Sequence, residues 1–182
     1  MTPDTPFDPS AAGSPAFDPV SGPGGDPRTD PTGAPGAGAE KASIDGAAGI
    51  TRGVRRAFSA AGMVSVTEFS LKTGRRADIL AIDPKGLVTI VEVKSGPADF
   101  RADRKWPDYE AFCDRFYFAV GPDFPIELLP EDRGLIVADA WDAMVLREGP
   151  VAALPAPRRK AVLLRFAHAA AGRLHRIEDP RL

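Results

Sequence analysis

Two carboxylates and a lysine stand out in this chain because their spacing suits joint chemistry. Asp78 and Glu92 lie fourteen positions apart, and Lys94 follows Glu92 by two. Side chains alternate along a strand, so Glu92 and Lys94 share one face of the apolar segment 87–95. Burying a carboxylate and an ammonium in such a strand is costly without a compensating charge. A divalent metal ion held by Asp78 and Glu92, with Lys94 beside it, would supply that charge.

The segments that carry these residues have patterns typical of strands joined by short turns. Apolar residues dominate 75–82 and 87–95, and the residues between them, 83–86, have turn composition. Residues 63–71 alternate between apolar and polar and end at the turn 72–74. Three consecutive strands with short turns predict an antiparallel meander.

Helices and further strands are predicted around this meander. An apolar stripe over 43–62 predicts a helix that ends near Gly62. Gly96 and Pro97 have the composition of a helix start, and Pro107 should break or restart that helix. The other predicted elements are strands at 115–120, 134–138 and 144–146, a helical turn at 125–129 and a helix at 158–176.

The predicted order of elements defines the fold class. Helix, three-strand meander, helix and strand, with later additions, indicate an α/β (α+β) domain with a mixed central sheet flanked by helices and a C-terminal helix. The side chains of that last helix expected to face inward are Val162, Leu163, Phe166, Ala169, Ala170 and Leu174.

Residues 1–42 differ in composition from the rest of the chain. Residues 1–40 hold nine of the 19 prolines and six acids against the single base Arg28. Such a stretch cannot bury enough apolar surface to offset its ordering entropy, so we expect a disordered acidic tail before a domain at 43–182. The 22 basic and 19 acidic residues that remain give 41–182 a net charge of +3, which is compatible with nucleic-acid binding.

The sequence also indicates the cellular compartment of the protein. The sequence shows neither the basic start and apolar run of a signal peptide nor a stretch of about 20 apolar residues, so a cytoplasmic protein without membrane contact is expected. The lone Cys113 excludes an intramolecular disulfide and a cysteine zinc cluster, and we expect a buried free thiol.

Several stretches of the predicted domain resemble a known family. They are Gly-Arg-Arg-Ala-Asp (74–78), Val-Glu-Val-Lys-Ser (91–95), Ala-Asp-Phe-Arg-Ala-Asp-Arg-Lys-Trp-Pro-Asp-Tyr (98–109), Phe-Cys-Asp-Arg-Phe-Tyr-Phe-Ala-Val (112–120) and Leu-Leu-Pro-Glu-Asp-Arg-Gly-Leu-Ile-Val-Ala-Asp-Ala (128–140). Residues 49–180 are similar to the MmcB family of bacterial DNA repair proteins. The element order and the placement of Asp78 and Glu92-Val93-Lys94 resemble the PD-(D/E)XK nuclease superfamily. Ala77 stands where the superfamily motif has proline, a position at which the superfamily is lax.

The resemblance implies a restriction-endonuclease-like core and a metal-dependent DNA endonuclease that hydrolyses phosphodiesters in DNA damage repair. Asp78, Glu92 and the backbone carbonyl of Val93 would hold Mg²⁺, with Mn²⁺ as a substitute, because magnesium prefers oxygen ligands and keeps several waters. The metal would polarise the phosphodiester and acidify a water molecule. Lys94 would orient that water or help to deprotonate it, and would offset charge on the phosphate. DNA is then the expected partner, and the protein would be associated with the nucleoid while bound to it.

Two readings remain open for the acidic residues. The carboxylates and Lys94 could belong to a surface hairpin with an edge lysine, although the apolar residues on both faces of 87–95 favour a central strand. Glu68, on the neighbouring predicted strand, shares the parity of Val64 and Val66. It is either an additional catalytic acid that faces inward or an exposed strand residue.

Basic and aromatic residues near the predicted site are candidates for DNA contacts. A basic kink at Pro107 with an aromatic beside it suits a DNA backbone or a splayed base. The alternative is a solvated helix face with local ion pairs. Relatives in the superfamily keep polar residues that line the site at the positions of Lys105 and Tyr109. The candidates are Arg76, Arg101, Arg104, Lys105, Trp106 and Tyr109.

Two other functions compete with the nuclease. One is a catalytically silent module on a nuclease fold that binds DNA or recruits repair partners, although such a module has no physical need for an intact Asp78, Glu92 and Lys94. The other is an adaptor that recruits a repair protein through its acidic tail. A homodimer would suit paired cuts, and duplex ends, flaps, junctions and RNA all remain open as substrates.

Overall fold

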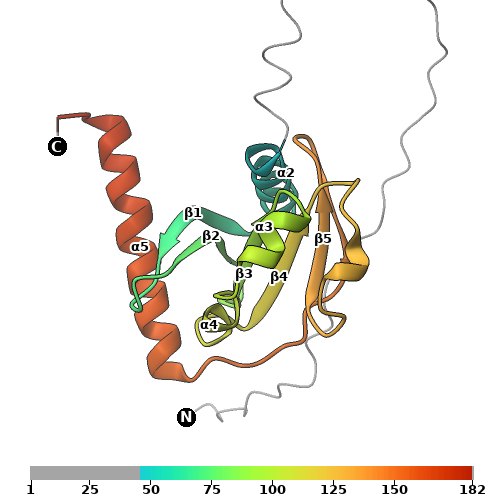
Figure 1. Ribbon diagram of the computed structural model, residues 1–182. Helices are drawn as coiled ribbons and strands as arrows, with labels where there is room; N and C mark the ends of the chain where they lie inside the picture. The colour runs from blue at the N-terminus through green and yellow to red at the C-terminus, as the bar shows by residue number, and fades with distance from the viewer. Residues whose placement is uncertain (1–45, 182) are drawn as a thin grey trace, which may run out of the picture. The chain divides into compact units, whose positions relative to one another are not determined.

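The computed structural model describes residues 46–181 as a sheet with helices on its faces and along one edge (Figure 1). The strands are β1 (Val64–Ser70), β2 (Arg76–Ile82), β3 (Val88–Lys94), β4 (Arg115–Val120), β5 (Gly134–Ala138) and β6 (Ala143–Arg147). The helices are α2 (Ala47–Ala60), α3 (Pro97–Ala102), α4 (Pro107–Glu110) and α5 (Ala156–Glu178), with one 3-10 turn at Ile126–Leu128. The tail predicted at 1–42 lies outside the described residues.

The described strands form one mixed sheet in the order β1-β2-β3-β4-β5-β6. β1, β2 and β3 pair antiparallel, which confirms the predicted meander. β3, β4 and β5 run parallel, and β6 returns antiparallel to β5. Every residue of β3 is buried because both of its faces are covered. The alternative of a surface hairpin with an edge lysine is therefore wrong.

Helix α2 covers one face of the sheet, and the other face is covered mainly from the C-terminal half of the chain. Ile50, Val54 and Phe58 recur at helical spacing on α2 and pack against side chains such as Val91 of β3. On the opposite face, Ile90 lies in a second cluster with Tyr109, Phe116, Phe118 and Val162. Alternate residues of β3 thus point into two separate cores, and Glu92 and Lys94 share the parity of Ile90.

The backbone of Glu68 interrupts the alternation of β1. Its φ is 50°, a left-handed conformation that is uncommon for residues other than glycine. Val66 and Phe69, three positions apart, are consequently both buried in the same cluster. The alternation of side chains counted from Val64 therefore fails at this point. The prediction that Glu68 faces inward is wrong, because its side chain is exposed.

Helix α5 lies along β1, at the edge of the sheet (Figure 1). Val162 is buried, and the ring of Phe166 packs 6.4 Å from that of Phe69. Arg173 donates to the backbone carbonyl of Thr67. The prediction that Leu174 faces inward is wrong because its side chain is 52% exposed.

Two smaller predictions are confirmed. Pro107 begins α4, and Gly96 and Pro97 begin α3. Cys113, which follows α4, is a buried free thiol. In the stretch 46–181, every helix is too short or too polar to cross a bilayer.

Candidate active site

Strands β2 and β3 stop pairing at Asp78. Their ladder runs from Ile82 opposite Val88 to Ile79 opposite Val91 and ends there. The Oδ2 atom of Asp78 instead accepts a hydrogen bond of 2.7 Å from the backbone N–H of Val93. The carboxylate takes the place of a strand partner, and this fixes it beside the end of β3.

Glu92 and Lys94 project from that end of β3 into a nearly buried ionic cluster. Lys94 Nζ donates to Glu92 Oε1 at 3.2 Å and to Asp103 Oδ2 at 2.5 Å. The side chains of Lys94, Glu92 and Asp103 are 4%, 9% and 13% exposed. The second oxygen of Glu92, Oε2, is buried and has no hydrogen-bond partner among residues 46–181. Asp78, Glu92 and Asp103 thus place three acids around one lysine.

The surplus of acids shifts the proton affinity of the cluster. Burial raises the pKa of Asp78 despite the hydrogen bond from Val93. Burial and the charge of Asp78 raise the pKa of Glu92 to about 8, against the opposing effect of Lys94. Burial alone would lower the pKa of Lys94, but the hydrogen bond to Asp103 and the charge of Glu92 raise it above its usual value. Lys94 therefore stays protonated. Its single positive charge does not compensate the charges of both Asp78 and Glu92.

The sequence analysis did not assign Asp103 to this site. Asp103 caps the C-terminal end of α3, and its Oδ1 accepts a hydrogen bond from the N–H of Lys105 at 2.8 Å. Phe100 of α3 anchors the helix, with its ring edge-on to that of Phe118 at 5.6 Å. Burial would raise the pKa of Asp103, yet the bond from Lys94 lowers it, so Asp103 is ionised and holds the ammonium in place.

Glu68 and Arg76 form an exposed ion pair at the margin of the cluster, with Arg76 Nε 2.5 Å from Glu68 Oε2. The register of β1 and β2 flanks these residues, because Thr67 pairs with Ile79 and Phe69 with Ala77. Glu68 consequently lies opposite Asp78, and its charge contributes to the raised pKa of Asp78. Glu68 is thus close to the predicted ligands, although its carboxylate pairs with Arg76.

The remaining candidates for DNA contacts separate into two groups. Arg101, Arg104 and Lys105 are exposed at the end of α3. Tyr109 is only 5% exposed, and its ring lies in the core. Its hydroxyl donates to the carbonyl of Arg76 at 3.1 Å, and burial together with the charge of Glu92 raises its pKa to about 12.

Trp106 is partly buried and packs against the core. Its ring stacks on Phe116 at 5.7 Å and meets Phe118 edge-on at 5.3 Å. The guanidinium of Arg133 lies 5.4 Å from the centre of the same ring. Trp106 and Tyr109 therefore support the wall of the site from within.

The chemistry of the donors fits magnesium. Asp78 and Glu92 offer hard oxygen ligands, both have a raised pKa, and Oε2 of Glu92 lacks a partner within 46–181. A bound cation would lower the pKa of both carboxyl groups and would give Oε2 of Glu92 a partner. Over the part of the chain that is described, no group of three or more His, Cys, Asp or Glu is placed to hold a metal. Two carboxylates suffice for an ion that keeps several waters, and the carbonyl of Val93 stays a predicted ligand.

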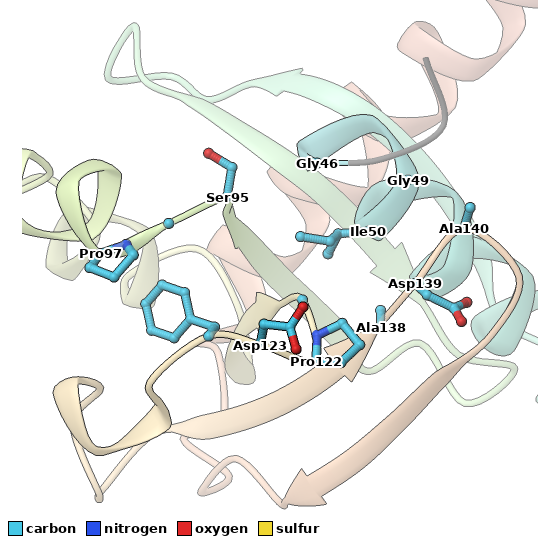
Figure 2. Close-up of a pocket in the computed structure, with 13 residues that line it drawn as sticks. Gly46, Gly49, Ile50, Ser95, Pro97, Pro122, Asp123, Ala138, Asp139 and Ala140 are labelled. Atoms are coloured by element: carbon cyan, nitrogen blue, oxygen red, sulfur yellow. The ribbon is translucent and has the colours of Figure 1, made fainter. Parts of the chain in front are cut away.

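A hollow of about 490 Å³ opens beside α2 (Figure 2), and its lining includes none of Asp78, Glu92, Lys94 and Asp103. It lies where the parallel strands β3, β4 and β5 end, a common position for ligands in sheets of this kind. Ser95, next to Lys94, lines one part, and Ile50 of α2 lines another. The loops after β4 and β5 contribute Asp123 and Asp139.

Fold and site together define a class: a mixed α/β domain with a buried carboxylate–lysine cluster where two strands of a meander separate. Within this class the chain belongs to the MmcB-like DNA repair protein family, whose model matches residues 35–181. This membership indicates a role in DNA repair.

One solved structure is similar to this chain at 44% sequence identity. It is the SPO1766 protein of unknown function from Silicibacter pomeroyi, with a TM-score of 0.73. The match covers 75% of this chain and 94% of that one. None of the curated proteins matches the chain.

Proposed function

We propose that this chain is a magnesium-dependent deoxyribonuclease of the PD-(D/E)XK type that acts in DNA repair. The observation that carries the proposal is the buried cluster of Asp78, Glu92 and Lys94, in which Oε2 of Glu92 has no hydrogen-bond partner within 46–181. A carboxylate kept in that state costs folding free energy, and a bound cation offsets this cost. The family's role in DNA repair supplies the substrate class.

Each residue has a separate task in this mechanism. Asp78 and Glu92 would hold magnesium, which when bound polarises the phosphodiester and acidifies water. Asp78 is oriented by the N–H of Val93. Lys94 is oriented by Glu92 and Asp103, and its positive charge offsets the charge that develops on the phosphate.

The raised pKa of Lys94 favours one of its two predicted roles. A general base must first release its own proton, which a lysine between Glu92 and Asp103 resists. Orientation of water and neutralisation of phosphate charge are therefore the roles we assign to Lys94.

The decisive experiment measures cleavage of a labelled DNA panel (single strand, duplex, flap, fork and junction) with Mg²⁺, with Mn²⁺ and with EDTA. We expect Asp78→Asn and Glu92→Gln each to reduce the cleavage rate by more than about 100-fold, because each removes a metal ligand. Glu127→Gln is the matched control. Glu127 is exposed in the 3-10 turn, so this substitution removes the same charge away from the site. Circular dichroism would confirm that all variants fold.

Equal cleavage by the wild type and both site variants would refute the proposal. DNA binding that is unaffected by EDTA, with no cleavage of any substrate by the wild type, would indicate the catalytically silent module instead.

A further inference from the structure

Helix α2 presents three arginines on the side that faces away from the sheet. Arg52, Arg55 and Arg56 are exposed and follow the spacing i, i+3, i+4, while Ile50 and Val54 face inward. Within residues 46–181 none of the three arginines forms an ion pair, and Arg55 Nε donates to the hydroxyl of Ser65 at 3.3 Å. We call Arg52, Arg55 and Arg56 the arginine surface of α2.

A large aromatic side chain stands beside this surface. Trp141, in the turn between β5 and β6, is 61% exposed. The guanidinium carbons of Arg52 and Arg56 lie 5.1 and 5.6 Å from the centre of its ring, a distance typical of cation–π contacts. The turn is well defined, because Oδ1 of Asp139 accepts hydrogen bonds from the N–H groups of Trp141 and Asp142. The indole is thus held in place on the outside of the molecule.

The arginine surface borders a groove that leads toward the candidate active site. The groove has a volume of about 660 Å³ and is lined by α2 and by Thr67 and Glu68 of β1. Glu68 lies opposite Asp78, where β2 and β3 separate. Its negative charge is neutralised by Arg76, so the lining of the groove is positive in total. A polyanion lying in this groove would lie beside Glu68, the neighbour of Asp78 on the adjacent strand.

We propose that the arginine surface of α2 and Trp141 bind a single strand of DNA and deliver it to the Asp78–Glu92 cluster. Arginines that follow a groove attract the phosphate backbone, and an exposed indole stacks on a base. The base must be unpaired, since a base within a duplex has no free face for the indole. This inference rests on the proposed function, and it names the strand and the surface that the function uses.

The test is fluorescence anisotropy of a labelled oligodeoxythymidine with the full chain in EDTA, over a series of salt concentrations. We expect the triple variant Arg52→Ala, Arg55→Ala, Arg56→Ala to weaken binding at least about tenfold and to reduce the salt slope of log K by about 2. The matched control is Lys85→Ala, Lys160→Ala, Arg176→Ala, which removes three exposed positive charges elsewhere. This control should change affinity less than about twofold.

The aromatic contact is tested separately. Trp141→Ala should weaken binding of the single strand about tenfold and leave the salt slope unchanged, and Trp141→Phe should restore most of the affinity. The wild type should bind the corresponding duplex more weakly. Equal binding of the duplex together with an unaffected Trp141→Ala variant would overturn the assignment to a single strand. A wild type that binds an acidic polyglutamate peptide and no DNA would show that the surface takes a protein partner.

These experiments can refute the binding inference and the proposed nuclease function separately. If the wild type cleaves DNA and the α2 triple variant binds as tightly as the wild type, the inference is refuted and the nuclease stands. If the wild type binds the single strand through α2 without cleaving any substrate, the nuclease is refuted and the inference stands.

Discussion

At the scale of single residues, the dominant feature is a carboxylate that the protein does not fully satisfy. Glu92 has one oxygen bonded to Lys94 and one without a hydrogen-bond partner inside 46–181. The nearby Asp78 adds like charge, which is why the pKa of Glu92 rises to about 8. Near neutral pH and without metal, this group holds a proton more readily than an ordinary carboxyl does. Metal binding should therefore release protons.

Magnesium should stabilise the fold through Glu92. We expect millimolar Mg²⁺ to raise the Tm of the wild type by several degrees, because an ion that binds only the folded state shifts the unfolding equilibrium. Glu92→Gln should show little shift, and without metal it should be at least as stable as the wild type, since the substitution removes a buried carboxyl that is poorly satisfied. Differential scanning calorimetry with and without Mg²⁺ measures both quantities. Glu127→Gln should respond as the wild type does, and an equal shift in Glu92→Gln would exclude Glu92 as a ligand.

The sequence predicted part of the site but not all of it. Asp78, Glu92 and Lys94 were identifiable because polar residues are conspicuous in apolar strands. Asp103 was not, because several charged residues follow Gly96 and their order does not show which one turns toward Lys94. The arginine surface of α2 had a visible signal in the spacing of its three arginines, which the apolar stripe of the same helix obscured.

At the scale of elements, α2 lies against the turn between β5 and β6 without space for a side chain. A Cβ atom added at Gly53 would lie 2.5 Å from the carbonyl oxygen of Asp142 and closer still to that of Asp139. Backbone atoms cannot withdraw as a flexible side chain can. The contact also places Trp141 beside Arg52.

Gly53→Ala should therefore destabilise the protein, although alanine has the higher helix propensity. Propensity alone predicts a gain of about 1 kcal/mol from alanine in a helix. The collision predicts a net loss of about 1–3 kcal/mol, because α2 must move away from the turn. Urea unfolding followed by circular dichroism measures the difference. Ser59→Ala, at an exposed position of the same helix, should be neutral or slightly stabilising. A stabilised Gly53→Ala variant would contradict the close packing.

The elements themselves were largely predictable, and the exceptions have physical causes. Each strand of the meander was found because apolar periodicity reflects burial. The orientation of Glu68 was missed because a single left-handed residue breaks the alternation on which parity depends. Periodicity predicted that Leu174 faces inward. The apolar stripe of α5 is buried at Val162 but exposed at Leu174.

At the scale of the whole molecule, Asp114 connects the sheet to the C-terminal helix. Its Oδ2 accepts a bond of 2.8 Å from the N–H of Val88, and its Oδ1 accepts one of 2.8 Å from the N–H of Leu154. Arg159 of α5 donates to both oxygens, at 2.7 and 2.6 Å. Burial would raise the pKa of Asp114, but the bonds from Arg159 and the two N–H groups lower it.

Asp114→Asn should cost roughly 1–3 kcal/mol of stability at pH 7, because it weakens the hydrogen bonds that a buried carboxylate accepts from Arg159 and two backbone N–H groups. A depressed pKa in the folded state means that the stabilisation is present above the unfolded pKa and is lost as the pH falls through the folded pKa. The Tm of the wild type should consequently decline toward low pH, starting near pH 4, and the decline should be shallower in the variant. Asp123→Asn, at an exposed position, is the control. Parallel pH profiles for wild type and Asp114→Asn would exclude this linkage.

The position of α5 along β1 has a consequence for the order in which the molecule is completed during synthesis. Arg165 and Arg173 donate to the carbonyls of Ser70 and Thr67, which removes acceptors that another strand would need for pairing. All of the described strands precede α5 in the chain, so the ribosome finishes the sheet before it makes the helix that shields the first strand. Until α5 emerges, the nascent protein exposes a strand edge that the finished protein hides. Chaperones that bind nascent chains would find β1 accessible only in that interval.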